Sequence, residues 1–224
     1  MMVIGLAPDY HPTMSRTDND SVSAVESWKS QAFSFSGICF AVFAGLWGAF
    51  ALGAMESRVL QDTVGPIGWT AAFVGLLGVA RELDGVWSRR VAGAFASLGL
   101  VGASVTAVGN LLELTGVVDT LPAFVDALQG LLLAGIVLGF LAVAVGVVRA
   151  SGSSRRLALL LAAPPIVFLV NVVRVASLGS TTPTWGPFVL ATCQAIALLG
   201  IGYVLRAGAE PAAALEQGAT QTTE

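Results

Sequence analysis

The chain has 224 residues, of which 55% are apolar and only 11% are charged, and its mean hydropathy is +0.81. These values exclude an ordinary soluble domain of this length. A net charge of −3 provides no basic face for binding nucleic acid. The two cysteines, Cys39 and Cys193, lie within apolar runs, which excludes a disulfide framework and a metal site. The composition therefore predicts an all-α, polytopic transmembrane helix bundle.

Six apolar runs follow one another along the chain. A helix needs about 20 mainly apolar residues to cross about 30 Å of hydrocarbon. The second run is the shortest, and we expect the dipeptide Gly65-Pro66 to start its helix. Because the connections are short, consecutive helices are expected to be antiparallel neighbours. The six predicted spans are residues 32–55, 67–80, 91–112, 124–148, 157–178 and 185–205.

The basic residues are sorted between the two sides of this predicted bundle. Of the eleven Lys and Arg residues, only Arg58 and Arg174 fall on the side opposite to the termini. Basic loops are retained in the cytoplasm during insertion, so the sorting predicts a plasma-membrane protein with both termini inside. Residues 1–31 and 207–224 are polar and are expected to be disordered cytoplasmic tails that flank a transmembrane domain at 32–206.

Rows of small residues mark three of the predicted helices. Such rows let two helix backbones approach closely, and close contact is a main source of helix association in lipid. The row on the first helix can pack inside the bundle, or it can form the face of a homodimer or the contact with a partner membrane protein. The rows are Gly37, Ala41, Gly45, Ala49 and Gly53 on the first span, Gly99, Ala103 and Ala107 on the third, and Gly135 and Gly139 on the fourth.

Two adjacent prolines, Pro164 and Pro165, lie near the middle of the fifth predicted span. Together they remove two backbone donors and clash with the preceding turn, so this helix is expected to kink or break. The freed carbonyl groups then need partners from neighbouring helices or from water.

Polar side chains gather near the outer ends of the later helices. Ionisable groups are costly inside lipid, so they are candidates for function. If the third and fifth spans touch, Glu113 and Arg174 lie at similar depth and can form an ion pair. The same side chains can instead act as a structural latch between helices. The candidate polar cluster consists of Asn110, Glu113, Asp126, Gln129, Asn171, Arg174 and Gln194.

The segment from Pro164-Pro165 to Asn171-Val-Val-Arg174 resembles the proline-then-N-x-x-R helix of exosortases and archaeosortases, which are intramembrane cysteine transpeptidases. Such enzymes need a cysteine nucleophile on the preceding helix and a later histidine, and this chain has neither. Phosphate-loop, zinc-protease, nucleophile-elbow and paired-histidine haem signatures are also absent, so no enzyme activity and no cofactor are expected. In overall pattern, the chain resembles uncharacterised six-helix membrane proteins of archaea and actinobacteria.

Two functional interpretations remain open from the sequence. The first is a non-enzymatic scaffold or accessory subunit of the membrane. The alternative is a small-solute transporter or facilitator with a polar site between the third and sixth spans. A water-accessible cavity lined by the asparagines and charges of the polar cluster favours transport. A cluster whose members satisfy one another, without a cavity, favours the scaffold.

Overall fold

The described part of the protein is entirely helical. The structure, a computed structural model, describes residues 16–55, 59–118, 123–150, 155–178 and 185–221, and no strand occurs among them. The helices are α1 (Arg16–Ala51), α2 (Val59–Arg81), α3 (Val86–Leu114), α4 (Ala123–Ala134), the π-helical turn η1 (Gly135–Gly139), α5 (Phe140–Arg149), α6 (Arg155–Leu178) and α7 (Gly186–Gln221). Six helical stretches are long and apolar enough to cross a membrane, because α4, η1 and α5 together form the fourth. The predicted fold class is confirmed.

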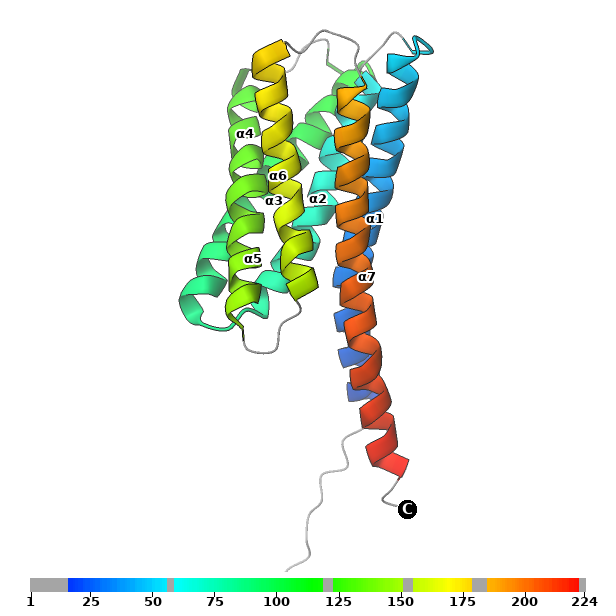
Figure 1. Cartoon of the computed structure of the whole chain (residues 1–224), viewed down its shortest axis with the longest axis vertical. Coiled ribbons are helices and arrows are strands. Elements are labelled where there is room, and N and C mark those ends of the chain that lie inside the picture. Colours follow the sequence, from blue (N-terminus) through cyan, green and yellow to red (C-terminus); the bar gives the residue numbers. More distant parts are fainter. Residues whose placement is uncertain (1–15, 56–58, 119–122, 151–154, 179–184, 222–224) are drawn as a thin grey trace, which may run out of the picture.

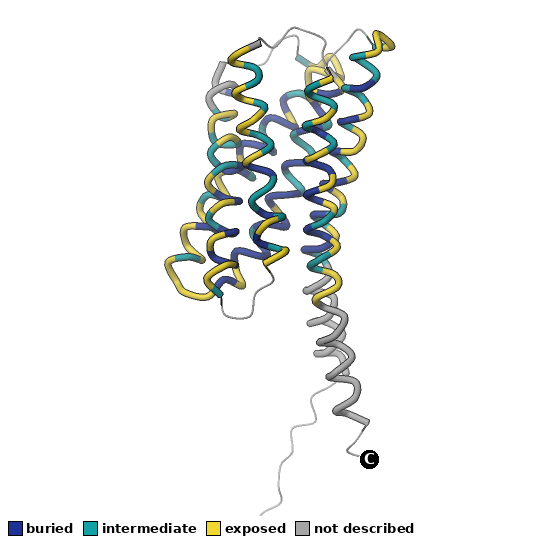
Figure 2. Tube along the Cα trace, in the orientation of Figure 1, coloured by how far each residue is buried: buried dark blue, intermediate teal, exposed yellow. Residues whose placement is uncertain are grey.

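The six spans form a closed ring. Each span packs against the next one in the chain, and α7 returns to pack against α1. The start of α1 and the end of α7 lie at the same end of the molecule, which we call the terminal end, and the opposite end is called the far end (Figure 1). Buried residues lie on the helix faces toward the interior of the ring, and exposed residues lie mostly on the outer faces (Figure 2). This pattern is typical of a bundle surrounded by lipid.

The second span is longer than the sequence indicated. The helix α2 begins at Val59 rather than at residue 67, so Pro66 lies inside it and does not start it. Proline is tolerated within membrane helices when another group bonds to the carbonyl that it leaves free. Helix α6 likewise runs without interruption through Pro164 and Pro165, whose rings are fully buried, so the predicted break does not occur.

The two tails also differ from expectation. Helix α1 starts at Arg16, within the segment predicted to be disordered, and α7 continues to Gln221. Extending an existing helix adds one hydrogen bond per residue without a new nucleation step, so a stable membrane span can carry helix into polar sequence.

Two of the predicted small-residue rows pack against each other. A Cβ atom built on Gly99 would lie 2.9 Å from the Cα atom of Gly135, and one built on Gly135 would overlap the Cα atom of Gly99. One turn along, a Cβ atom on Gly139 would lie 3.4 Å from the backbone nitrogen of Ala96. The third and fourth spans therefore meet through their backbones, at glycines that belong to two of the predicted rows.

The row on the first helix does not act as a single face. Residues four apart advance by about 40° around a helix of 3.6 residues per turn, so a long row winds around its axis. Gly37 is buried, and a Cβ atom there would overlap Leu199 of α7. Ala41 and Gly45 are exposed, and Gly53 lies beyond the helix with a φ of 72°.

The fourth span changes its neighbours at the π-helical turn. The half nearer the terminal end, α5, packs against α2, α3 and α6 and buries Phe140 and Val143 completely. The half nearer the far end, α4, packs extensively only against α3 and η1 among the described residues. A π-helical turn re-aims the residues that follow it, and such turns are frequent at functional sites. The interior of the ring is consequently filled toward the terminal end and left partly open toward the far end.

An ion pair joins α1 to the turn between α2 and α3. The ammonium of Lys29, the only lysine of the chain, is paired with Glu82, and the Lys29 side chain is largely buried. This pair lies at the terminal end, where the packed interior begins.

Candidate functional site

Two adjoining cavities occupy the open half of the ring. The larger has a volume of about 570 Å³ and the smaller about 330 Å³. The larger lies among α1, α2, α3, α4 and α6, and the smaller lies among α1, α2, α6 and α7. Five side chains line both of them: Phe40, Phe43, Asp62, Trp69 and Phe168. The two cavities therefore adjoin, and together they are called the hollow at the far end of the bundle.

Aromatic rings form the floor of this hollow. The ring centroids of Phe40 and Trp69 are 5.0 Å apart, in an edge-to-face arrangement. Behind them, Phe73 and Phe140 lie 6.1 and 6.0 Å from Trp69, and both are fully buried. The edge-to-face packing of Phe40 against Trp69 stabilises the fold by more than the burial of apolar surface alone. The hollow is thus closed on the side of the terminal end.

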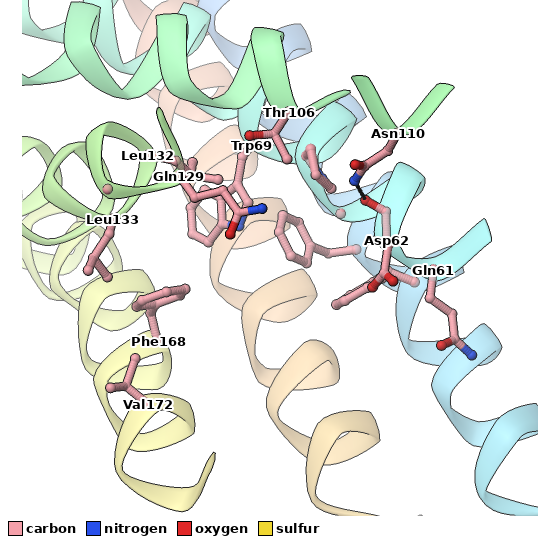
Figure 3. A pocket seen from close by; sticks show the side chains of 15 residues that line it. Gln61, Asp62, Trp69, Thr106, Asn110, Gln129, Leu132, Leu133, Phe168 and Val172 are labelled. Atoms are coloured by element: carbon pink, nitrogen blue, oxygen red, sulfur yellow. Dashed lines mark hydrogen bonds between the residues drawn. The ribbon is translucent and has the colours of Figure 1, made fainter. Parts of the chain in front are cut away.

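The side chain of Asn110 is positioned in the larger cavity by a proline on the facing helix. Pro66 has no N–H, so the carbonyl oxygen of Asp62, four residues earlier, has no donor within α2. The Nδ2 group of Asn110 donates a hydrogen bond to that oxygen (Figure 3). A proline that sequence reasoning placed at the helix start therefore creates the acceptor that orients a residue of the polar cluster.

We expect the contributions of Asn110 and Pro66 to stability to be coupled. Replacing Asn110 with alanine should lower the free energy of unfolding by about 1 kcal/mol, because it leaves the Asp62 carbonyl without its donor. In a Pro66→Ala background, the N–H group of Ala at position 66 can donate to that carbonyl. Asn110→Ala should then lower the free energy of unfolding by much less. Unfolding of the four proteins in a double-mutant cycle measures the coupling. Equal costs of Asn110→Ala in both backgrounds would show that Asn110 and Pro66 contribute to stability independently.

Two glutamines extend from opposite sides of the larger cavity. Gln129 of α4 is exposed and points into the hollow beside Trp69 (Figure 3). Gln61 of α2 is fully buried; its Nε2 donates to the carbonyl oxygen of Leu46 at 3.0 Å, and its Oε1 has no partner. Thr106 completes the polar part of the wall and donates to the Gly102 oxygen at 2.8 Å.

The smaller cavity contains three members of the predicted polar cluster: Asn171, Arg174 and Gln194. The Nε of Arg174 donates to Oδ1 of Asn171 at 3.2 Å, across the turn of α6 that the sequence spacing indicated. Gln194 of α7 is 3% exposed, and neither its Nε2 nor its Oε1 has a hydrogen-bond partner. A buried amide without partners costs stability, so its presence requires an explanation.

The predicted ion pair between Glu113 and Arg174 is not formed. Helices α3 and α6 do not pack extensively against each other, Glu113 is exposed at the end of α3, and it lines neither cavity. The pair was inferred from equal depth alone, which does not establish that two helices are neighbours around a ring. The side chain of Asp126 lies outside the described residues.

Several lining residues were not predicted from the sequence. Asp62 and Gln61 lie before residue 67, the predicted start of the second span, and were therefore not placed on a helix. Trp69 lies within the predicted second span and was not singled out as a lining residue; it is 7% exposed and lies in the floor of the hollow. The signal that could have identified Asp62 is its spacing of four residues before Pro66.

No known protein family, curated protein or solved structure matches this chain in the comparisons. Among the described residues, no group of three His, Cys, Asp or Glu side chains is arranged to hold a metal ion. Cys39 is half-buried on α1 and Cys193 is exposed on α7.

Proposed function

We propose that this membrane protein is a small-solute transporter or facilitator whose solute site is the hollow at the far end of the ring. The observation that carries the proposal is a cavity of about 570 Å³ inside an apolar membrane bundle, which adjoins a second one and is lined by amide and charged side chains. Ligand sites are typically concave and mainly apolar, with a few polar groups that fix orientation. Binding and release need no chemical step, so no catalytic residue is assigned.

The orientation follows from the charges. Seven described arginines lie at the terminal end, and basic ends are retained in the cytoplasm. With the termini inside, the hollow opens to the outer side of the plasma membrane. The seven are Arg81, Arg89, Arg90, Arg149, Arg155, Arg156 and Arg206.

The closed floor favours transport by a conformational change over a permanently open pore. Phe40, Trp69 and the rings behind them separate the hollow from the terminal end. A solute that reaches the hollow can cross only when this aromatic cluster rearranges, as in alternating access between two sides of a fixed site.

Filling the larger cavity is expected to abolish solute movement. Gly130 lines this cavity, and a Cβ atom built there meets no atom within 4 Å, so the backbone position accepts a side chain without a clash. In proteoliposomes tested with urea, glycerol, glycine and benzenesulfonate, Gly130→Trp should reduce protein-dependent flux about tenfold or more, because it occupies the space that the solute needs.

The matched control is Gly93→Trp on α3, which also meets no atom within 4 Å and lines neither cavity. It should keep the native rate for every solute that the native protein moves. Absence of protein-dependent flux for all four solutes, or native flux through Gly130→Trp, would contradict the transport proposal.

A scaffold or accessory subunit is the second candidate, favoured by the outer face of α1. Ala41 and Gly45 are exposed there, and no protein atom lies within 4 Å of a Cβ atom built on Gly45. Small residues on a lipid-facing surface let a second helix approach closely. The partner face would therefore consist of Ala41, Gly45 and the half-buried Ala49, without Gly37 and Gly53.

Cross-linking in native membranes tests whether two copies of this protein associate through the outer face of α1. In a Cys39→Ser, Cys193→Ser background, Gly45→Cys should form a disulfide-linked dimer under mild oxidation, because close backbone approach brings two thiols together. Leu159→Cys, at an exposed position on α6, should remain monomeric. A monomer in both variants would refute the homodimer.

A further inference from the structure

Arg174 carries a positive charge at the far end of the bundle, although membrane insertion favours basic residues at the opposite, cytoplasmic end. This residue lies near the far end of α6, opposite to the end that holds the other described arginines. Among the described side chains, no carboxylate oxygen lies within 4.0 Å of its guanidinium nitrogens. Ionisable residues in membrane spans are costly and mark substrate or ion pathways. Arg174 lines the smaller cavity, so its charge faces space that a ligand can occupy.

The neighbours of Arg174 hold it in place without neutralising it. Its Nε–H donates to Oδ1 of Asn171, which is an uncharged acceptor. A guanidinium has five N–H donors, so this bond engages only one of them. The remaining donors have the geometry that suits the oxygens of a carboxylate, sulfonate or phosphate group.

Gln194 provides a second, independent indication of a ligand. It lines the same cavity, is nine-tenths or more buried, and both polar atoms of its amide lack partners. Its amide atoms expose almost no surface, so the inference requires the side chain to turn when the ligand binds. The free protein already carries the free-energy cost of burying this amide without hydrogen bonds. A ligand that supplies those hydrogen bonds removes the cost, so the amide contributes to affinity.

The rest of the cavity limits what the ligand can be. Its walls are mainly apolar, formed by aromatic rings such as Phe40 and Trp69 and by aliphatic side chains from α6 and α7. Asp62 also lines the cavity and disfavours a second negative charge. We infer that the solute is a small monoanion attached to an apolar or aromatic body, with its charged oxygens at Arg174 and Gln194. This inference rests on the proposed function and names the class of solute for the same site.

Equilibrium binding of two matched probes tests the inference. Benzenesulfonate is permanently anionic, and benzenesulfonamide has nearly the same shape and is neutral. With the native protein in phosphatidylcholine nanodiscs, the dissociation constant for the anion should be about tenfold or more lower than that for the amide. Arg174→Gln should reduce this preference to about twofold or less, and Arg174→Lys should retain most of it, because it keeps the charge.

Two further variants distinguish the site from a general effect of charge. Gln194→Leu should weaken benzenesulfonate binding about fivefold, since it removes one hydrogen bond to the ligand. Arg149→Gln, at the terminal end, should leave the preference between the two probes unchanged.

The possible failures can be told apart. Equal binding of both probes, or an anion preference that persists in Arg174→Gln, overturns the solute class. If neither probe binds but flux of urea or glycerol is blocked by Gly130→Trp, the solute class is wrong and the transport proposal stands. If the anion preference depends on Arg174 but no flux occurs, the binding site stands and the transport proposal fails.

Discussion

Replacing Gly135 with valine is expected to lower the free energy of unfolding by about 3 kcal/mol, the largest single effect in this protein. The backbones of Gly99 and Gly135 are in contact, and any Cβ atom on Gly135 overlaps the Cα atom of Gly99. No flexible side chain can move aside, so the third and fourth spans must separate. In membrane helices this close contact provides much of the association energy, and its loss is not compensated by a hydrophobic effect.

The matched control is Gly130→Val, five residues earlier in the same span, where a Cβ atom meets no neighbour within 4 Å. It should change stability by about 0.5 kcal/mol or less, as is usual for unpacked positions. Unfolding of both variants in mixed micelles, followed by circular dichroism, measures the difference. Similar losses in the two variants would mean that helix propensity or lipid contact, rather than the Gly99–Gly135 contact, determines the result.

Replacing Gln194 with leucine is expected to stabilise the ligand-free protein by about 1–3 kcal/mol, because a buried amide without partners carries a desolvation cost of that size. Leucine fills a similar volume without polar atoms. The same substitution should weaken solute binding, and this combination is typical of a residue retained for function at the expense of stability.

Gln61 provides the comparison, since it is equally buried but donates from Nε2 to the Leu46 oxygen. Gln61→Leu loses that bond, so it should be neutral or destabilising by about 1 kcal/mol. Thermal unfolding of the two variants without ligand is the measurement. A loss of stability in Gln194→Leu would show that its amide has partners in the native membrane and would remove one support of the solute site.

Much of the fold could be predicted from the sequence because membrane constraints are simple. Length and hydropathy predicted six spans, and the structure contains six stretches that meet those criteria. Small residues at a spacing of four identified Gly99 and Gly135 as positions of close approach, and the structure pairs them with each other. These features depend on one helix or on two consecutive helices, so local pattern is sufficient to find them.

The candidate site was harder to predict because it depends on which helices meet around the ring. Asn171 and Arg174 lie one turn apart on α6, where the Nε of Arg174 donates to Oδ1 of Asn171, and both belong to the predicted polar cluster. The partner of Arg174 was predicted wrongly, since α3 and α6 do not pack extensively together. The hollow itself arises because the fourth span changes neighbours at η1, and a π-helical turn has no reliable sequence signature.

The proposed solute site requires a water-accessible hollow within the membrane at the far end of the ring. Thiol labelling from outside the cell tests this most directly, in a Cys39→Ser, Cys193→Ser background. Gln129 is exposed and lines the larger cavity, whereas Val108, equally far from the far end of its helix, is 57% exposed and lines neither cavity. Water is excluded from the hydrocarbon, so a lipid-facing thiol stays protonated and unreactive toward a membrane-impermeant reagent.

We predict that Gln129→Cys reacts rapidly with an impermeant cationic thiosulfonate and that Gly130→Trp blocks this reaction. Val108→Cys should remain unlabelled although it lies equally far from the far end of its helix, so depth alone cannot explain the difference. An unreactive Gln129→Cys, or labelling of Val108→Cys at an equal rate, would contradict the existence of the hollow and with it the proposed solute site.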